Sequence, residues 1–262
     1  MVKVGQLNSK DFPANKKYAI PLSITGASNY SLIPSQRSAI LLLNRSILSS
    51  VAKVSGGEGI RIKPVGMHTK AEWTIQMSAI YSSLTRSNLT TAYLSNGTGG
   101  EFYTRISSTA GIQVKNGRDG DDTWTQIPLQ AGKWLHITYV HKDKKTTVYV
   151  NGKVQKVFEN SAITFGENSM IVVGNSGYRN DYLREIRLWD KALTESEIND
   201  YLYLPMDPAT PHLISYLPLS KEMETKDLKA PAGTENVTTK ARIEYVENVK
   251  FPADELVIVN QE

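Results

Sequence analysis

The stretch GKWLHITYVHKDKKTTVYVNGKVQKVF (132–158) decides the fold. Apolar residues recur at every second position, which predicts two half-buried strands, with Leu135, Ile137 and Tyr139 in the first and Val148 and Val150 in the second. The polar segment 141–145 separates them. Asn151 and Gly152 come next, and this pair readily supplies the two positive φ angles of a tight hairpin turn. The stretch therefore predicts an antiparallel three-strand meander that forms the spine of a β-sandwich.

Short apolar or alternating segments recur at regular spacing along most of the chain. From residue 59 onward the predicted strands are 59–65, 71–82, 91–96, 101–107, 111–116, 123–129, 170–174, 212–220 and 241–251, with 255–262 as a further edge strand. Turns rich in Gly and Asn join many of them. This spacing is typical of an all-β, two-sheet antiparallel jelly-roll sandwich and argues against βαβ units.

One short helix is predicted between residues 195 and 202. Thr194 lies three residues before Glu197, which is the spacing of a capping box, and Leu193 and Ile198 are placed to form a hydrophobic staple across it. Pro205 ends the helical segment.

Two units are predicted, 1–54 and 55–262, with the flexible sequence SGGEG (55–59) at their boundary. The first unit contains two recognisable strands, KYAIPLSIT (17–25) and SAILLLN (38–44). Pro21 places the earlier strand at an edge or a bulge, because proline cannot donate to a ladder. About fifty residues are too few for a self-sufficient sandwich, so this unit is expected to be a partial β-domain.

Composition limits the classes of function. The 262 residues carry 30 Lys and Arg and 26 Asp and Glu, and the basic residues are scattered, which argues against a nucleic-acid partner. The chain has no cysteine, which excludes disulfides and thiolate metal sites. It also lacks a membrane-spanning apolar run and a signal peptide. Either the protein is cytosolic or its export signal is absent from this chain.

Two linked motifs, KWLHITYVHKDKKTTVYVNGK (133–153) and YLREIRLWDKALTESEI (182–198), resemble the laminin-G-like branch of the concanavalin A-like jelly rolls. The resemblance covers about residues 60–250. The matching residues are Trp134, His136, Tyr149, Asn151, Gly152, Glu185, Ile186, Arg187, Trp189, Ala192, Leu193, Glu197 and Ile198. Arg184 stands where the family usually carries an aspartate, so any role of that carboxylate is lost or reassigned here.

The segment KYAIPLSITGASNYSLIPSQRSAILLL (17–43) resembles the C-terminal half of a small β-domain found in surface lipoproteins of the Bacteroidetes type. That resemblance implies that the N-terminal half of the domain and its lipidated export signal are absent from this chain. It further implies an extracytoplasmic protein at the bacterial outer-membrane surface, held at the membrane periphery by the missing lipid anchor.

The laminin-G-like fold also includes retaining glycosidases, so catalysis is an alternative. Such enzymes need closely spaced carboxylates on one strand face, as in Glu-x-Asp-x-x-Glu, and no such run exists in this sequence. Glu185 and Asp190 fall on opposite faces by parity. The four histidines are dispersed, and His136 is expected to be a packed or hydrogen-bonded residue. The sequence therefore predicts a non-catalytic protein without a cofactor.

A calcium ion is the one metal that the sequence leaves open. Asp119, Asp121 and Asp122 lie in the loop NGRDGDDTW (116–124), which could wrap oxygen ligands around a hard cation or could be an acidic surface turn.

Sugar-binding side chains are expected in the loops, because exposed aromatic rings stack on sugars while amides and charged groups reach the hydroxyls. Three places offer such residues: Trp124 beside the acidic loop; Tyr178, Arg179, Asn180 and Tyr182 in GNSGYRNDY (174–182); and Tyr93 with Asn96. The resulting hypothesis is a carbohydrate-binding module of a cell-surface glycan-capture protein, with a polysaccharide or oligosaccharide as partner. A protein-interaction or adhesion module is the alternative, and a cryptic glycoside hydrolase is the third.

Overall fold

A computed structural model describes residues 18–26, 31, 33, 35, 37–43, 46–57, 59–66, 70–84, 87–93, 102–115, 120–159, 163–174 and 178–260. It divides into two compact units, Met1–Ile47 and Leu48–Glu262. The sequence analysis had assigned residues 48–54 to the first unit. In the structure they belong to a strand of the large sandwich, β3 (Ile47–Gly56), which the apolar pattern had not revealed.

The first unit contains one two-stranded antiparallel sheet, formed by β1 (Tyr18–Ser23) and β2 (Ser38–Leu43). The register runs from Tyr18 opposite Leu43 to Ser23 opposite Ser38. Both predicted strands are therefore confirmed. Pro21 is tolerated because a two-stranded sheet leaves one side of each strand unpaired.

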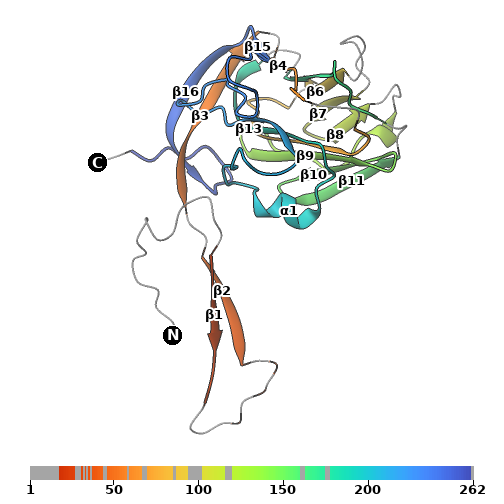
Figure 1. Ribbon diagram of the computed structural model, residues 1–262. Coiled ribbons are helices and arrows are strands. Elements are labelled where there is room, and N and C mark those ends of the chain that lie inside the picture. The colour runs from red at the N-terminus through yellow and green to blue at the C-terminus, as the bar shows by residue number, and fades with distance from the viewer. Residues whose placement is uncertain are drawn as a thin grey trace. The chain divides into compact units, whose positions relative to one another are not determined.

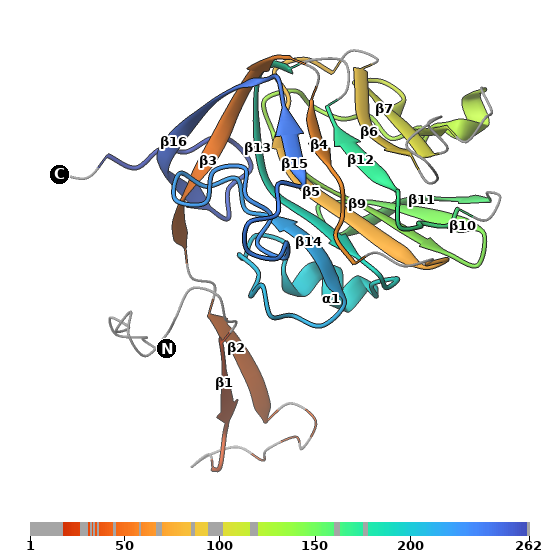
Figure 2. The same ribbon diagram turned by 45° about the horizontal axis from the view of Figure 1, so that its top comes forward.

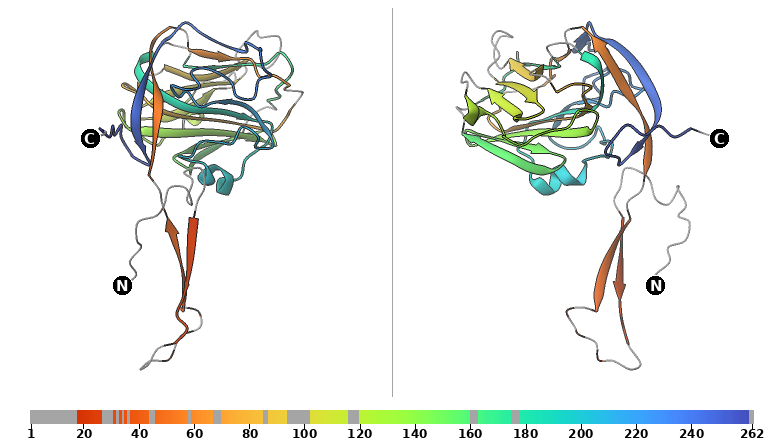
Figure 3. Two further views of the ribbon diagram at one scale, coloured as in Figure 1. Left: turned by 60° about the vertical axis from the view of Figure 1, so that its left-hand side comes forward. Right: turned by 180° about the vertical axis from the view of Figure 1, so that it is seen from behind.

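The second unit is an antiparallel sandwich of two sheets, and it confirms the predicted fold class (Figure 1). The larger sheet has eight strands in the order β11 (Lys153–Glu159), β10 (Lys145–Val150), β9 (Trp134–Lys142), β5 (Trp73–Ile80), β13 (Tyr178–Trp189), β3 and β16 (Arg242–Phe251), with β14 (Leu213–Leu217) also paired to β13. The smaller sheet has six strands in the order β15 (Val237–Thr239), β4 (Ile60–Ile62), β12 (Met170–Val173), β6 (Ser87–Tyr93), β7 (Phe102–Ser107) and β8 (Gly111–Lys115). Figure 3 shows β3 and β16 running side by side at one edge of the larger sheet.

The predicted meander is confirmed as β9, β10 and β11. Two residues form each tight turn, Asp143–Lys144 in the first and Asn151–Gly152 in the second, and all four have positive φ. Gly152 has a further constraint, because a Cβ there would lie 2.0 Å from Asn199 Oδ1. The half-buried prediction for β9 is wrong, since its residues 134–141 are all buried. Both faces of this strand are covered.

One face of β9 lines the core between the two sheets. Ile137 and Tyr139 lie there with Ile75 and Met77 of β5, and Phe102 of β7 approaches from the opposite sheet. The Phe102 and Tyr139 rings meet edge to face with centroids 5.4 Å apart. Each such side chain contributes roughly 1.5–3 kcal/mol when fully buried, so this layer dominates the stability of the sandwich.

The other face of β9 is covered by α1 (Glu195–Asp200) and the chain that follows it. Figures 1 and 3 show α1 on the side of the larger sheet that faces away from the smaller one. Its capping box is confirmed, since Thr194 and Glu197 exchange side-chain and backbone hydrogen bonds. Leu193 and Ile198 are both buried in one apolar cluster, as a staple requires. In the described part of the chain no helix has the length and apolar character needed to cross a membrane.

Segment 123–129 differs from its predicted strand. A 3-10 helix, η2 (Asp121–Thr123), leads into a single bridge between Trp124 and Gln113, and the chain then runs irregularly beside β8. Gln126 has a positive φ and Pro128 has no amide hydrogen, so a regular ladder cannot form. The predicted last strand is likewise reduced to a short pairing with β16, through bonds from Lys250 N to Val257 O and from Val259 N to Asn248 O.

Candidate functional site

The strands that precede the two loops predicted to bind sugar, β8 and β12, run in opposite directions in the smaller sheet. Lys115, which precedes the acidic loop, is level with Tyr103 and Val172 across the ladder. β6 ends two residues beyond this row, at Tyr93, and residues 116–119 lie outside the described part of the chain. Gly174 follows Val173, which pairs with Ile60 and Thr90 at the other end. β8 and β12 therefore leave the sheet in opposite directions, and Tyr93 lies at the end that β8 approaches, whereas residues 175–177 are likewise outside the described part of the chain.

Trp124 is 5% exposed, so its ring does not offer the open face that stacking requires. Its backbone bridges to Gln113, which is itself paired with Arg105, and this places all three residues on the outer face of the smaller sheet. Trp124 packs onto that face instead of projecting from a loop.

Residues 178–182, predicted to lie in the second loop, instead begin strand β13, where Tyr182 is half-buried and Asn180 is exposed with a positive φ. The β13 ladder to β3 shifts register between Arg179 and Asp181, which marks a bulge at this position. The side chains of Tyr178 and Arg179 lie outside the described residues. So do Asn96 and the side chain of Tyr93, and a sugar-binding role for these residues stays a prediction.

The calcium hypothesis also falls largely outside what the structure describes, because Asp119 and the Asp121 side chain are not covered. Asp122 is exposed in η2. Among the described residues no group of three His, Asp or Glu side chains is placed to hold a metal ion. The ammonium of Lys156, on β11, donates to the carbonyl oxygens of Asp122 and Trp124 at 2.9 and 2.7 Å. Two carbonyls of this loop therefore already face a cation that the protein supplies.

The outer face of the larger sheet carries a buried polar layer. Ser78 Oγ lies 2.6 Å from Nδ1 of His136, and Gln76 accepts a hydrogen bond from the Trp189 indole at 2.9 Å. Burial lowers the pKa of His136 well below its usual value, and the nearby Arg187 and Arg184 lower it further. His136 is thus a neutral, packed residue, in agreement with its prediction.

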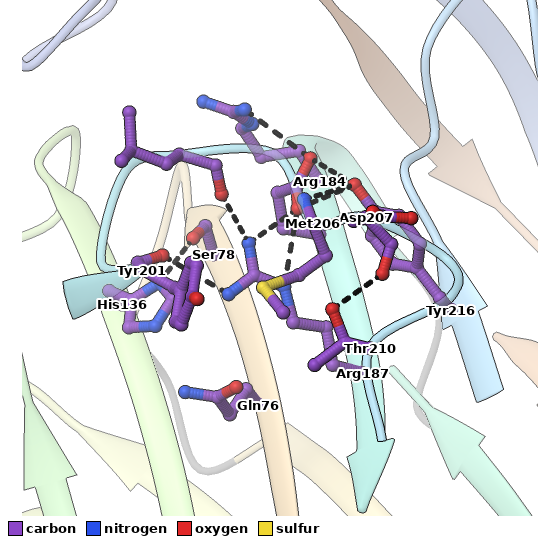
Figure 4. A network of polar contacts seen from close by, with 12 residues as sticks. Gln76, Ser78, His136, Arg184, Arg187, Tyr201, Met206, Asp207, Thr210 and Tyr216 are labelled. Carbon is purple, nitrogen blue, oxygen red and sulfur yellow. Dashed lines mark hydrogen bonds and ion pairs between the residues drawn. The ribbon is translucent and has the colours of Figure 1, made fainter. Parts of the chain in front are cut away.

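An ion cluster lies in the same layer, where β13 changes partner from β3 to β14 (Figure 4). The Glu185 carboxylate accepts from Arg187 at 2.5 Å, from the Tyr216 hydroxyl at 3.0 Å and from Arg184 at 3.4 Å. Glu185 has a positive φ because the ladder to β5 shifts register between Arg184 and Arg187. Arg184, which replaces the aspartate usual in the family, is therefore part of a structural ion pair.

This cluster anchors the chain that covers the sheet. Arg187 donates to the carbonyl oxygens of Tyr201 and Leu204, and the Tyr216 hydroxyl accepts from the amide of Met206 (Figure 4). Burial is the largest cause that raises the pKa of Tyr216, and the negative charge of Glu185 raises this pKa further. His136 Nε2 and Arg184 Nε have no hydrogen-bond partner among the described residues, but both side chains are almost completely buried, so we do not place a ligand there.

The outer face of the smaller sheet differs, because aromatic and polar side chains project from it. In β7, Phe102, Thr104 and Ile106 are buried toward the core, while Tyr103, Arg105 and Ser107 alternate with them and are partly exposed. Arg105 Nε donates to the Tyr103 hydroxyl at 2.8 Å, and its guanidinium carbon lies 5.0 Å from the ring centroid. Figure 2 shows β4, β12, β6 and β7 side by side from this side of the sandwich.

The ladder aligns further polar residues with this pair. A row across the sheet runs through Thr238, Arg61, Val172, Thr91, Tyr103 and Lys115. At about 4.8 Å per strand, the row spans roughly 24 Å. Val172 is buried within it, while Arg61, Tyr103 and Lys115 are partly exposed. The candidate site is therefore the part of this face around Tyr103 and Arg105, which we name the β7 face.

Sequence reasoning missed Tyr103 and Arg105, although the evidence was available. The segment FYTRIS alternates apolar and polar residues, which predicts that the second, fourth and sixth side chains point away from the core. The sequence analysis had sought aromatic residues in the loops and had not considered the outward face of this strand.

Several solved structures resemble the fold at low sequence identity. A protein from Bacteroides ovatus for which carbohydrate binding has been suggested matches 91% of this chain and 71% of its own, with 17% identity and a TM-score of 0.60. A heptameric pentraxin from Limulus polyphemus matches 76% of this chain and 94% of its own, at 13% identity and a TM-score of 0.49. Domain 4 of an extracellular arabinanase from Geobacillus stearothermophilus, solved with arabinotriose, matches 70% of this chain and 86% of its own, at 14% identity and a TM-score of 0.41.

No curated relative matches the sequence. The family model of the concanavalin A-like lectin/glucanases superfamily matches residues 55–199, which is more than half of the chain and includes both motifs of the predicted resemblance. With the antiparallel sandwich described above, this match identifies the chain as a member of the concanavalin A-like lectin/glucanases superfamily.

Proposed function

We propose that this protein is a non-catalytic carbohydrate-binding protein whose site is the β7 face. The observation that carries the proposal is the Tyr103–Arg105 pair, an aromatic ring held by a guanidinium on a partly exposed strand. Sugar rings pack against aromatic faces, and polar groups beside the ring fix their orientation through hydroxyl hydrogen bonds. A strand positions such groups more rigidly than a loop does.

Among the residues that the structure describes, the contacts of the buried acidic side chains support a non-catalytic role. Glu185 is engaged by two arginines and a tyrosine, as described above. Asp181 accepts from the amide and hydroxyl of Ser82, and Asp227 accepts from Ser215, Asn236 and two backbone amides. A catalytic acid and nucleophile need access to the substrate, and these carboxylates instead hold strands and loops together.

The proposal includes display at a bacterial cell surface as part of a glycan-capture system. The resemblance of residues 17–43 to a surface-lipoprotein domain supports this location.

Affinity electrophoresis through gels that contain neutral and acidic polysaccharides tests the function, with calcium and with a chelator. We expect at least one polysaccharide to retard the protein. Tyr103→Ala should weaken that interaction roughly tenfold, about 1.4 kcal/mol, through loss of the stacking surface. Tyr182→Ala is the comparison, because it removes a partly buried tyrosine from the loop that the sequence had favoured.

Loss of binding in Tyr182→Ala with full binding in Tyr103→Ala would move the site to that loop. No retardation in any gel, together with a stable protein partner in a pull-down, would favour the protein-interaction function instead.

A further inference from the structure

We infer that the β7 face selects acidic glycans, whose uronate or sulfate groups it binds through Arg105 with Lys115 beside it. This inference rests on the proposed function and adds the chemical class of the ligand. Its basis is the lack of acidic residues on the strands of the smaller sheet, together with the geometry of Arg105.

The six strands of the smaller sheet contain three basic residues, Arg61, Arg105 and Lys115, and no aspartate or glutamate. The larger sheet mixes both signs, with Glu159, Glu185 and Glu244 among its acidic residues. The whole chain carries a formal charge of only +4. The strands of the smaller sheet therefore differ from those of the larger one in carrying basic residues without acidic ones.

Strand alternation directs all three basic side chains outward. Ile60 and Ile62 flank Arg61, Thr104 and Ile106 flank Arg105, and all four flanking residues are buried, whereas the two arginines are partly exposed. Lys115 is paired with Tyr103 in the ladder, so it lies one strand from the tyrosine and on the same face.

The geometry of Arg105 suits an anion beside a sugar ring. Its Nε donates to the Tyr103 hydroxyl, so this contact occupies one edge of the guanidinium. A guanidinium has five N–H donors in a planar fork, and four of them are on the terminal nitrogens, which match the two oxygens of a carboxylate. The tyrosine that would stack on the sugar thus also orients the group that would bind its acid.

Acidic groups border this face without lying on its strands. Asp122 is exposed in η2, just before the Trp124 bridge to β8. A carboxylate at that rim repels an anionic chain that runs over η2, so we expect the ligand to bind at Tyr103 and Arg105 without crossing η2.

Calorimetric titration with matched pairs of oligosaccharides tests the inference. The probes are tetragalacturonate and its full methyl ester, and chondroitin sulfate and desulfated chondroitin oligosaccharides, with hexaglutamate as a polyanion without sugar. We expect each acidic member that binds to do so at least tenfold more tightly than its neutral counterpart, and 200 mM salt to weaken it relative to 50 mM.

Arg105→Gln should remove most of the preference for the acidic member, roughly tenfold. Arg242→Gln is the matched control, because Arg242 is an exposed arginine on β16 of the other sheet. This variant should keep the preference for the acidic member. Lys115→Gln provides a second variant in case Arg105→Gln does not fold, which circular dichroism will show.

The outcomes separate the two proposals. Equal or tighter binding of the neutral members overturns the acidic selectivity and leaves sugar binding intact. Equal binding of hexaglutamate overturns the inference as well, because the face would then attract any polyanion. If no saccharide binds, the proposed function fails together with this inference.

Discussion

Mild acid should destabilise this protein through His141. The side chain lies near the end of β9 at 1% exposure, stacked on Trp73 with ring centroids 5.2 Å apart. Its Nε2 accepts the amide hydrogen of Ile163 at 3.2 Å, and its Nδ1 lies 3.0 Å from Thr146 Oγ1. Accepting from an amide requires a lone pair on Nε2, so the neutral ring fits this position and the protonated ring does not.

The sign and size of the effect follow from the pKa. Burial lowers the pKa of His141 to about 4, whereas an unfolded histidine titrates near 6.5. Between these values the unfolded chain binds the extra proton. The free energy of unfolding should therefore fall by about 1.4 kcal/mol for each pH unit below 6.5, or roughly 2.5 kcal/mol by pH 4.5. His136, whose pKa is also lowered, adds a slope of the same sign.

Urea unfolding followed by tryptophan fluorescence from pH 7 to 4.5 measures this directly. His141→Gln keeps an acceptor for Ile163 but cannot be protonated, so its stability should decline less steeply by about 1.4 kcal/mol per pH unit. At pH 7 His141→Gln should lower the free energy of unfolding by about 1–2 kcal/mol, because the Thr146 contact and the ring stacking are lost. His212→Gln, at an exposed histidine paired with Asp190, is the control. Parallel pH curves for the wild-type protein and His141→Gln would refute the reasoning.

Two further substitutions test the framework of the sandwich. Glu185→Gln should cost about 3–5 kcal/mol in urea unfolding, because it leaves two buried arginines without their carboxylate, whereas Glu244→Gln in an exposed pair should cost under about 1 kcal/mol. Equal stability of these two variants would show that the cluster contributes little. Thr194→Ala should cost about 1 kcal/mol by removing the helix cap, and Thr194→Ser should restore most of it; no difference between the two would contradict a capping role.

Much of the fold could be predicted because local and tertiary preferences agree. The meander and its second turn follow from a period of two and from Asn151–Gly152, and both are confirmed. The helix start follows from Thr194 and Glu197, whose side chains bond each other's backbone. Such signals depend on residues close in sequence. These signals can be interpreted without knowledge of the tertiary contacts.

The covering of β9 could not be predicted, because it depends on segments that follow it by about fifty residues or more in the sequence. Trp189 and Met206 join Val140 in one apolar cluster and bury the face that alternation had assigned to solvent. The break in β13 at Glu185 was equally hidden, since a charged pair inside a strand resembles an exposed face until its partners are known. For the same reason Trp124 was expected in a loop, and the β7 face was not recognised.

The Lys156 ammonium that contacts the carbonyls of Asp122 and Trp124 is tethered to β11, so its effective concentration at those oxygens is fixed by the chain. A dissolved ion occupies such a position only in proportion to its concentration. The covalently attached ammonium supplies both carbonyl oxygens with a hydrogen-bond donor, and it joins β11, at the edge of the larger sheet, to the segment that runs beside β8. This connection between the two sheets is therefore made by the chain itself and needs no dissolved cation to bridge it.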